Sequence, residues 1–303
     1  MQKIKIQHYV PRFYLRNFSK KDGKQYIVNC FDKIESKQFV ENVDQIASEK
    51  YFYDIDRETE QLVEKELSKN EEELNCVYNK LISKKSLYCL NWKEKESLAR
   101  FAAIQDIRTR EMRETIKGIG NELKKFLSEK PTSEELERQL KEVATEQTAR
   151  RVHLKILIET LLGENHLVEM FLSLKWVLSD NNTKMPLWTS DHPVNRFNPM
   201  KQSPLGNLGL LSKGIEISFP LTPKLGLSFC DPVEYFYNPD HLACIKDNVL
   251  FYNTLQVRSC TRHVFSRDND FSIARKWLTE YPENKNQKRK RIQAQIFRKT
   301  GIA

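Results

Sequence analysis

The strongest constraint on the fold is a helical pattern confined to the middle of the chain. Over residues 59–83, apolar side chains recur three, four or seven residues apart amid dense charge, the pattern of an amphipathic helix. A second long helix is expected from Asn91 to about Leu127, and a third from Pro131 to a stop at Gly163. The segments on either side of these helices must therefore pack against a helical centre.

The stretch before the helices has the character of short strands. QYIVNCFD (25–32), KQFVENV (37–43) and YFYDI (51–55) combine β-branched and aromatic residues with polar turns between them. We interpret all three as strands.

The stretch after the helices mixes both kinds of pattern. HLVEMFLSL (166–174) predicts a short helix, and residues 175–180 with 185–194 predict a β-hairpin. GIEISFPLTPKLGLSF (214–229) predicts two more strands. Residues 240–264 and 271–281 are expected to be helical.

Together these patterns predict an α+β fold in which central long helices pack with short antiparallel β elements from the N- and C-terminal parts. We expect one domain over residues 1–284, which is β-rich to residue 57, helical over 58–163 and mixed over 164–284. A basic tail, 285–303, would follow it.

Positive charge is concentrated at the two ends. The net charge is +9, with +6 in residues 1–24 and +7 in residues 285–303, so the remainder carries −4. The body alone is thus not expected to be a basic nucleic-acid-binding surface. The tail could contact phosphates non-specifically or be a solvated terminus.

Several classes of protein are disfavoured by what the sequence lacks. No apolar run approaches the roughly 20 residues needed to cross a bilayer, and the start has no secretory signal, so a cytoplasmic protein without a membrane partner is expected. The six cysteines are dispersed and form no CxxC pair. No cofactor is expected, and the few carboxylates near the candidate motifs do not favour a divalent metal.

The opening run HYVPRFYLRNFS places His8 among residues that favour burial. With an ordinary pKa near about 6.5, its imidazole could act as a general acid or base. Alternatively, it is a core histidine bonded to a backbone carbonyl.

The central run FAAIQDIRTREMR places Gln105 and Arg108 on or near one side of a helix. An arginine at the edge of an apolar face can clamp a phosphate in bidentate fashion, or it can pair with an acid as a structural strut.

A third motif, LWTSDHPV, alternates along a strand, so either Thr189 and Asp191 or Ser190 and His192 would face a site. Asp191 could also simply end the strand in an Asx turn.

In the region from Asp247 to Ser266, which we expect to be largely helical, Asn253 would need partners if buried. Arg262 is related by four residues to another arginine, and such pairs more often face solvent.

In this order, the motifs HYVPRFYLRNFS, AAIQDIRTREMR, WTSDHPV and FPLTP and the closing N…RHVFS together resemble domain-of-unknown-function family 4238, over about residues 5 to 268. The resemblance implies no settled activity; members are spread among bacteria, some in mobile or defence loci. The family pattern singles out His8, Pro11, Tyr14, Gln105, Arg108, Ser190, Asp191, Pro193 and Asn253.

Our leading hypothesis from sequence is an enzyme acting on a phosphate-bearing substrate, most plausibly a metal-independent nuclease or phosphodiesterase. His8 would be the general acid or base, Arg108 would stabilise phosphate charge, and Asp191 would orient His8 or assist proton transfer. The substrate would be positioned by Gln105, Ser190, Asn253 and Arg262. The alternatives are a non-catalytic module that binds nucleic acid or protein through the basic ends, and a buried structural network.

Overall fold

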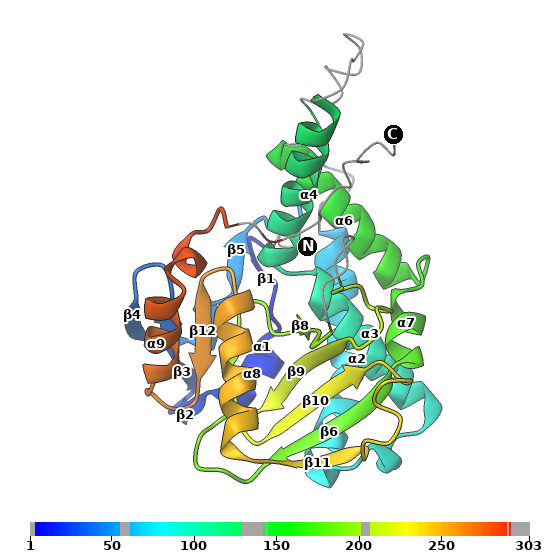
Figure 1. Cartoon of the computed structure of the whole chain (residues 1–303), viewed down its shortest axis with the longest axis vertical. Helices are drawn as coiled ribbons and strands as arrows, with labels where there is room; N and C mark the ends of the chain where they lie inside the picture. Colours follow the sequence, from blue (N-terminus) through cyan, green and yellow to red (C-terminus); the bar gives the residue numbers. More distant parts are fainter. Residues whose placement is uncertain are drawn as a thin grey trace, which may run out of the picture.

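The structure is a computed structural model that describes residues 4–54, 61–128, 142, 145–200, 207–289 and 291. Helices pack on several mainly antiparallel sheets, so the predicted α+β class is confirmed. Two of the helices, α4 and α6, pack against each other and project from the body (Figure 1). Within the described ranges, no helix is both long enough and apolar enough to cross a membrane.

The first sheet has the strand order β11-β6-β10-β9-β8. Its strands are β6 (Lys175–Asn181), β8 (Asn195–Phe197), β9 (Glu216–Thr222), β10 (Leu225–Cys230) and β11 (His241–Cys244). β9 and β10 form the hairpin predicted around Pro223, with Leu227 opposite Phe219. The pairing of β11 with β6 is parallel.

The second sheet has the order β2-β3-β12-β7, with β4 also paired to β3. Its strands are β2 (Lys20–Asp22), β3 (Gln25–Asp32), β4 (Lys37–Asn42), β7 (Thr189–Ser190) and β12 (His263–Ser266). Strands 25–32 and 37–43 are thus confirmed. The predicted hairpin of 175–180 with 185–194 is wrong, because β10 and β11 already occupy both edges of β6.

A small third sheet pairs β1 (Ile6–His8) with β5 (Ser48–Lys50). The strand predicted at 51–55 is wrong over its described residues, because Tyr51 has a positive φ of 52° and the chain turns there. Phe52 and Tyr53 are both buried, so their side chains do not alternate between core and solvent as in a half-exposed strand. Ile55 lies outside the described residues.

The longer helices are α2 (Leu62–Lys84), α3 (Trp92–Ile107), α4 (Arg110–Ser128), α6 (Glu146–Leu162), α7 (Leu167–Ser173), α8 (Lys246–Ser259) and α9 (Ser272–Glu280). Asn91 caps α3 in a reciprocal capping box with Glu94, so this helix begins where the sequence predicted. Gly163 ends α6 in the left-handed conformation, φ 75°, that favours glycine. The start predicted at Pro131 lies outside the described residues.

The helix predicted from Asn91 to Leu127 is in fact two helices, interrupted at Arg108 and Thr109. Thr109 begins α4 by accepting the backbone N–H of Met112 on its hydroxyl at 3.4 Å. The prediction was wrong because the interruption depends on partners of these two side chains that lie far away in the sequence.

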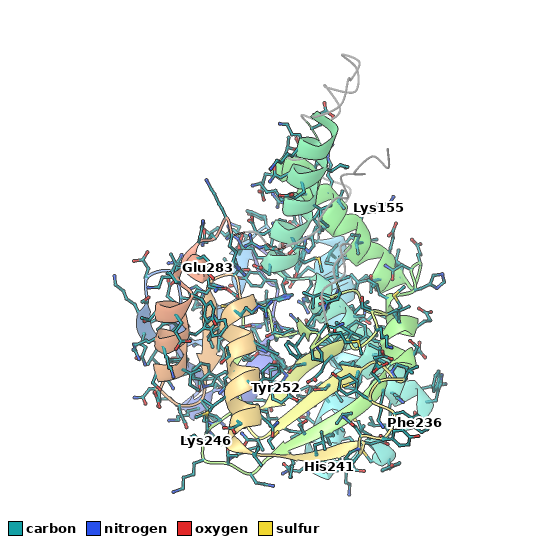
Figure 2. All side chains as sticks on the ribbon, in the orientation of Figure 1. Lys155, Phe236, His241, Lys246, Tyr252 and Glu283 are labelled. Carbon is teal, nitrogen blue, oxygen red and sulfur yellow. The ribbon has the colours of Figure 1, made fainter. Side chains whose placement is uncertain are left out.

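Residues 240–264 are not one helix either, since β11 precedes α8 and β12 follows it. Tyr252, labelled on α8 in Figure 2, donates a hydrogen bond to Glu216 of β9 at 3.1 Å, which ties the helix to the first sheet. The predicted helix at 271–281 is confirmed as α9.

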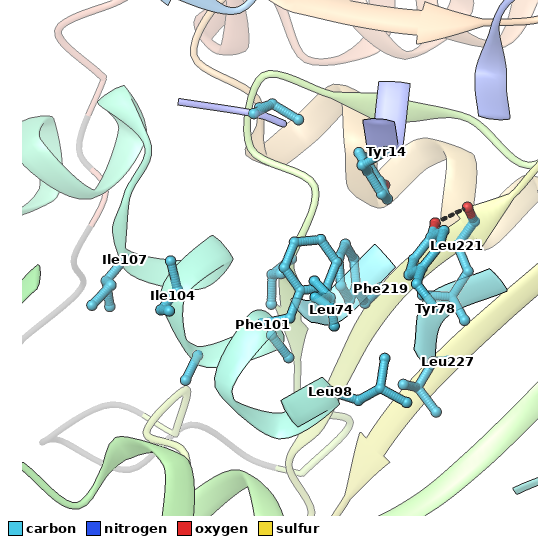
Figure 3. Packing of buried hydrophobic residues seen from close by; sticks show 14 of the residues in the cluster. Tyr14, Leu74, Tyr78, Leu98, Phe101, Ile104, Ile107, Phe219, Leu221 and Leu227 are labelled. Carbon is cyan, nitrogen blue, oxygen red and sulfur yellow. Dashed lines mark hydrogen bonds between the residues drawn. The ribbon is translucent and has the colours of Figure 1, made fainter. Parts of the chain in front are cut away.

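The N-terminal motif forms the short helix α1 (Arg12–Leu15) and the turn η1 (Arg16–Phe18), whose buried side chains pack in the main core. Tyr14 stacks on Phe219 with ring centroids 5.4 Å apart, and its hydroxyl donates to the carbonyl of Pro220 at 2.6 Å. Tyr78 donates similarly to the carbonyl of Leu221 (Figure 3). These aromatic residues are buried with their polar ends satisfied, so they fix α1 against the first sheet.

Candidate functional site

The junction between α3 and α4 is a run of polar side chains in the interior. All of its members are buried: Gln105, Asp106, Arg108, Thr109, Glu111 and Arg113. Buried polar groups require partners. At this junction the partners lie on two sides, one formed by β1 and α2 and the other by an open cavity.

On the first side, Arg108 has a partner for each nitrogen of its guanidinium. Nη1 donates to Glu71 at 2.9 Å, Nη2 to the carbonyl of His8 at 2.7 Å, and Nε to the hydroxyl of Tyr53 at 3.3 Å. These contacts are those of a structural strut, the second of the two alternatives left open by the sequence. Beside them, Gln105 donates to the carbonyl of Tyr9 at 3.1 Å.

The imidazole of His8 is half-buried next to this strut. Burial, assisted by the positive charges of Arg12 and Arg108, lowers the pKa of His8 from its ordinary value to about 4. The ring is therefore neutral near pH 7. Its Nε2 atom is buried and has no hydrogen-bond partner among the described residues.

Asp191 does not hydrogen-bond His8; its carboxylate holds the turn between α8 and β12. Oδ1 accepts the backbone N–H of Thr261 at 2.8 Å, and Oδ2 accepts those of Arg262 at 2.7 Å and His263 at 2.8 Å. Three charge-assisted hydrogen bonds to one buried carboxylate make a strong anchor for this turn.

The remaining predicted residues connect β7 and its neighbours to α8 and β3. Ser190 Oγ donates to Gln256 Oε1 at 2.6 Å, and Asn253 accepts the backbone N–H of Trp188 at 2.8 Å. The guanidinium of Arg262 pairs with Asp32 at 2.7 Å.

The seven predicted site residues therefore do not converge on one cavity. Arg108 lines a cavity of about 60 Å³ beside Glu71, and none of the seven lines the largest described cavity, of about 650 Å³. Their catalytic and binding roles stay predictions.

The large cavity opens on the second side of the junction. Five segments wall it: the α3–α4 junction with the start of α4, the loop after β7 with β8, the described residues between β8 and β9, the end of α8, and the residues after α9. Its charged lining residues are Asp106, Glu111, Arg196, Arg258, Arg289 and Arg291. Four guanidiniums against two carboxylates leave this lining positive, so it suits an anion.

His192 stands on the wall of this cavity. Its Nδ1 lies 2.7 Å from the hydroxyl of Thr109, which fixes the orientation of the ring. Burial lowers the pKa of His192, although the nearby carboxylates of Glu111 and Asp106 act in the opposite direction. The imidazole is therefore neutral at pH 7 and can accept a proton.

Both carboxylates of the cavity are engaged by arginines. Asp106 pairs with Arg196. Glu111 accepts from Arg289 Nη2 at 2.7 Å, from Arg291 Nε at 2.8 Å and from Thr261 Oγ1 at 3.0 Å, and these charges hold its pKa below the ordinary value against the effect of burial. The described part of the basic tail thus folds back onto the body.

Sequence reasoning reached part of this site and missed the rest. His192 was one of two alternatives drawn from strand alternation. Asp106, Glu111 and Arg196 were missed, although each lies within four residues of a motif residue already singled out. Arg289 was treated only as part of a charged tail.

A model of the family described as "Protein of unknown function (DUF4238)" matches residues 6–270. The chain belongs to this family. The resemblance inferred from the motifs is therefore confirmed. The family region includes the α3–α4 junction and His192, whereas Arg289 and Arg291 lie beyond it. Comparison with curated proteins and with solved structures yielded no match.

Proposed function

We propose that the chain hydrolyses a phosphate-bearing substrate, as a nuclease or phosphodiesterase, with His192 at its centre. The observation that carries this proposal is the placement of a neutral, oriented imidazole on the wall of a positively charged cavity. A general base needs both a fixed position and an available lone pair. Thr109 fixes the position of the His192 ring, and in the tautomer whose Nδ1–H donates to the Thr109 hydroxyl, Nε2 carries the available lone pair.

The reaction follows from these positions. His192 Nε2 takes a proton from a water molecule while the water oxygen forms a bond to phosphorus. The P–O bond to the leaving group breaks, and the leaving oxygen takes a proton from solvent. Arg196 would stabilise the charge that develops on the phosphate oxygens.

The test is hydrolysis of RNA, DNA and bis(p-nitrophenyl) phosphate, each with Mg²⁺ and with EDTA. His192→Ala should lower turnover by about 10² to 10⁴-fold. His241→Ala is the matched control, since His241 is exposed on the edge strand β11 (Figure 2). Unchanged turnover in a folded His192→Ala variant would contradict the proposal.

The pH profile gives a second readout. Because burial lowers the pKa of His192, the imidazole stays unprotonated to lower pH than an ordinary histidine. The acid limb of the turnover profile should therefore lie below the ordinary histidine pKa of 6.5.

The same assay separates the other hypotheses. If His8→Ala, and not His192→Ala, abolishes turnover, the centre lies at the first side of the junction. The absence of turnover together with binding of nucleic acid favours the non-catalytic module, which the positive cavity also supports. Among the described residues, no group of three or more His, Cys, Asp or Glu side chains is placed to hold a metal ion. The Mg²⁺ and EDTA arms test whether turnover depends on a divalent metal.

A further inference from the structure

The segment after α9 brings one arginine into the wall of the large cavity. α9 is followed by the turn η4 (Pro282–Lys285), where Figure 2 labels Glu283, and the chain then reaches the end of α8. Arg289 Nη2 donates there to the carbonyls of Ser259 at 3.2 Å and Cys260 at 2.9 Å, as well as to Glu111. Its side chain is only 10% exposed.

The other terminal nitrogen of this guanidinium is left over. Arg289 Nη1 is buried and has no hydrogen-bond partner among the described residues, although its side chain lines the cavity. A buried guanidinium N–H without an acceptor costs free energy, and an anion bound in the cavity would supply the missing acceptor. Arg291 differs, because Nε and Nη2 donate to Glu111 and Nη1 donates to the carbonyl of Gln287.

A second arginine, whose guanidinium has no partner among the described residues, lies on the same wall. Arg258 is in the last turn of α8, next to the Ser259 whose carbonyl Arg289 contacts, and its side chain is exposed. None of the described contacts gives its guanidinium an acceptor. Two guanidiniums with free donors on one wall are suited to holding the oxygens of a phosphate group.

We propose that Arg258 and Arg289 form a phosphate-binding position that is distinct from the scissile position beside His192 and Arg196. The substrate class is then a compound with at least two linked phosphates. This inference rests on the proposed function and adds the substrate class. It also assigns a binding role to a residue beyond the family region, so substrate preference is set partly by the C-terminal segment.

The experiment is isothermal titration calorimetry of the full chain with inorganic pyrophosphate and, separately, with inorganic phosphate. The wild type should bind pyrophosphate about tenfold or more tightly than phosphate, since a charge-assisted hydrogen bond contributes at least that factor. Arg289→Gln and Arg258→Gln should each remove most of this difference.

Two variants serve as controls. Arg267→Gln makes the same change of charge at an exposed position outside the cavity and should alter affinity less than threefold. Arg291→Gln also loses hydrogen bonds to Glu111, but Arg291 has no donor left for a ligand. This variant therefore measures only the effect of loosening the C-terminal segment from the body. Equal losses in Arg291→Gln and Arg289→Gln would overturn the assignment, as would unchanged binding by Arg289→Gln or a wild type that binds no pyrophosphate.

The result is independent of turnover. If pyrophosphate binds as expected and His192→Ala hydrolyses substrates like the wild type, the proposed function fails and this binding position stands. If His192→Ala is inactive and Arg289→Gln binds pyrophosphate like the wild type, the proposed function stands and the binding position of Arg258 and Arg289 fails.

Discussion

The two sides of the α3–α4 junction use the same kinds of residue differently. On the side of β1, the guanidinium of Arg108 has an acceptor for each nitrogen, and the side chain is buried. On the cavity side and within the described residues, Arg289 keeps one buried nitrogen without a partner, and no acceptor is described for the exposed guanidinium of Arg258. A saturated arginine contributes to stability, whereas an unsaturated one has donors left for a ligand.

The most distinctive motif residues need not be those that line the large cavity. The stretch from His8 to Phe18 and the side chains of Arg108 and Asp191 hold distant segments together. The large cavity is lined instead by residues close to them in the sequence, among them Asp106, His192 and Arg196. Of these, His192 contacts the hydroxyl of Thr109.

The largest test of this comparison is Asp191→Ala. The change leaves the backbone N–H groups of Thr261, Arg262 and His263 without their buried acceptor, and each such loss costs about 1–3 kcal/mol. We expect urea denaturation to show a loss of about 4 kcal/mol in the free energy of unfolding. Asp268→Ala, at an exposed loop position, is the control and should change little. A cost below about 1 kcal/mol would mean that Asp191 is not an anchor.

The next test compares the loss of stability when one arginine from each side of the junction is replaced by methionine. Arg108→Met leaves Glu71 and the carbonyl of His8 without a donor and should cost about 3 kcal/mol. Arg258→Met should change the free energy of unfolding by less than about 0.5 kcal/mol, because its guanidinium has no described partner to lose. Thermal or urea unfolding of both variants checks this. Similar costs would remove the distinction between the two sides.

The smallest expected effect concerns Glu64, which, like His8, has a buried atom without a described partner on the first side. Its Oε2 is buried and has no partner among the described residues, and burial raises its pKa to about 7. Because this folded pKa lies above the ordinary 4.5, folding favours the protonated acid, and stability falls as pH rises from about 4.5 to 7. Glu64→Gln should therefore be neutral at pH 4 and stabilising at pH 8, by about 1 kcal/mol after allowance for partial exposure.

Melting temperatures measured at both pH values check this prediction, with Glu66→Gln, in the same helix α2, as the control. A Glu64→Gln variant that gains nothing at pH 8 would show that the carboxylate of Glu64 finds a partner in solution.

Local pattern was enough to predict much of the fold. The cap at Asn91, the stop at Gly163, strand 25–32 and the hairpin around Pro223 all follow from residues close in sequence. The interruption at Thr109 could not be predicted in this way, because its hydroxyl meets His192, 83 residues away. The pairing of β7 with β12 rather than with β6 could not be predicted locally either, because it depends on which strands occupy the two edges of β6.

The candidate site was harder to predict for the same reason. Glu111 and Arg289 are 178 residues apart, and nothing in the spacing of either indicates the other. The sequence does indicate which segments matter, since the junction and the SDHP turn both border the cavity. It does not indicate which neighbouring side chain in each segment faces the opening, because that depends on the break between α3 and α4.

The two-residue interruption between α3 and α4 also limits how this molecule can change. An α-helix turns by about 100° per residue, so inserting or deleting one residue at the junction would swing Glu111 away from its arginines. The same rotation would disrupt the packing of α4 against α6. If Arg108 moved, strand β1 would also lose the hydrogen bond from Arg108 to the carbonyl of His8. The length of this junction is therefore expected to be invariant. Under the proposed binding role of Arg289, new specificities would arise by exchange of the C-terminal segment.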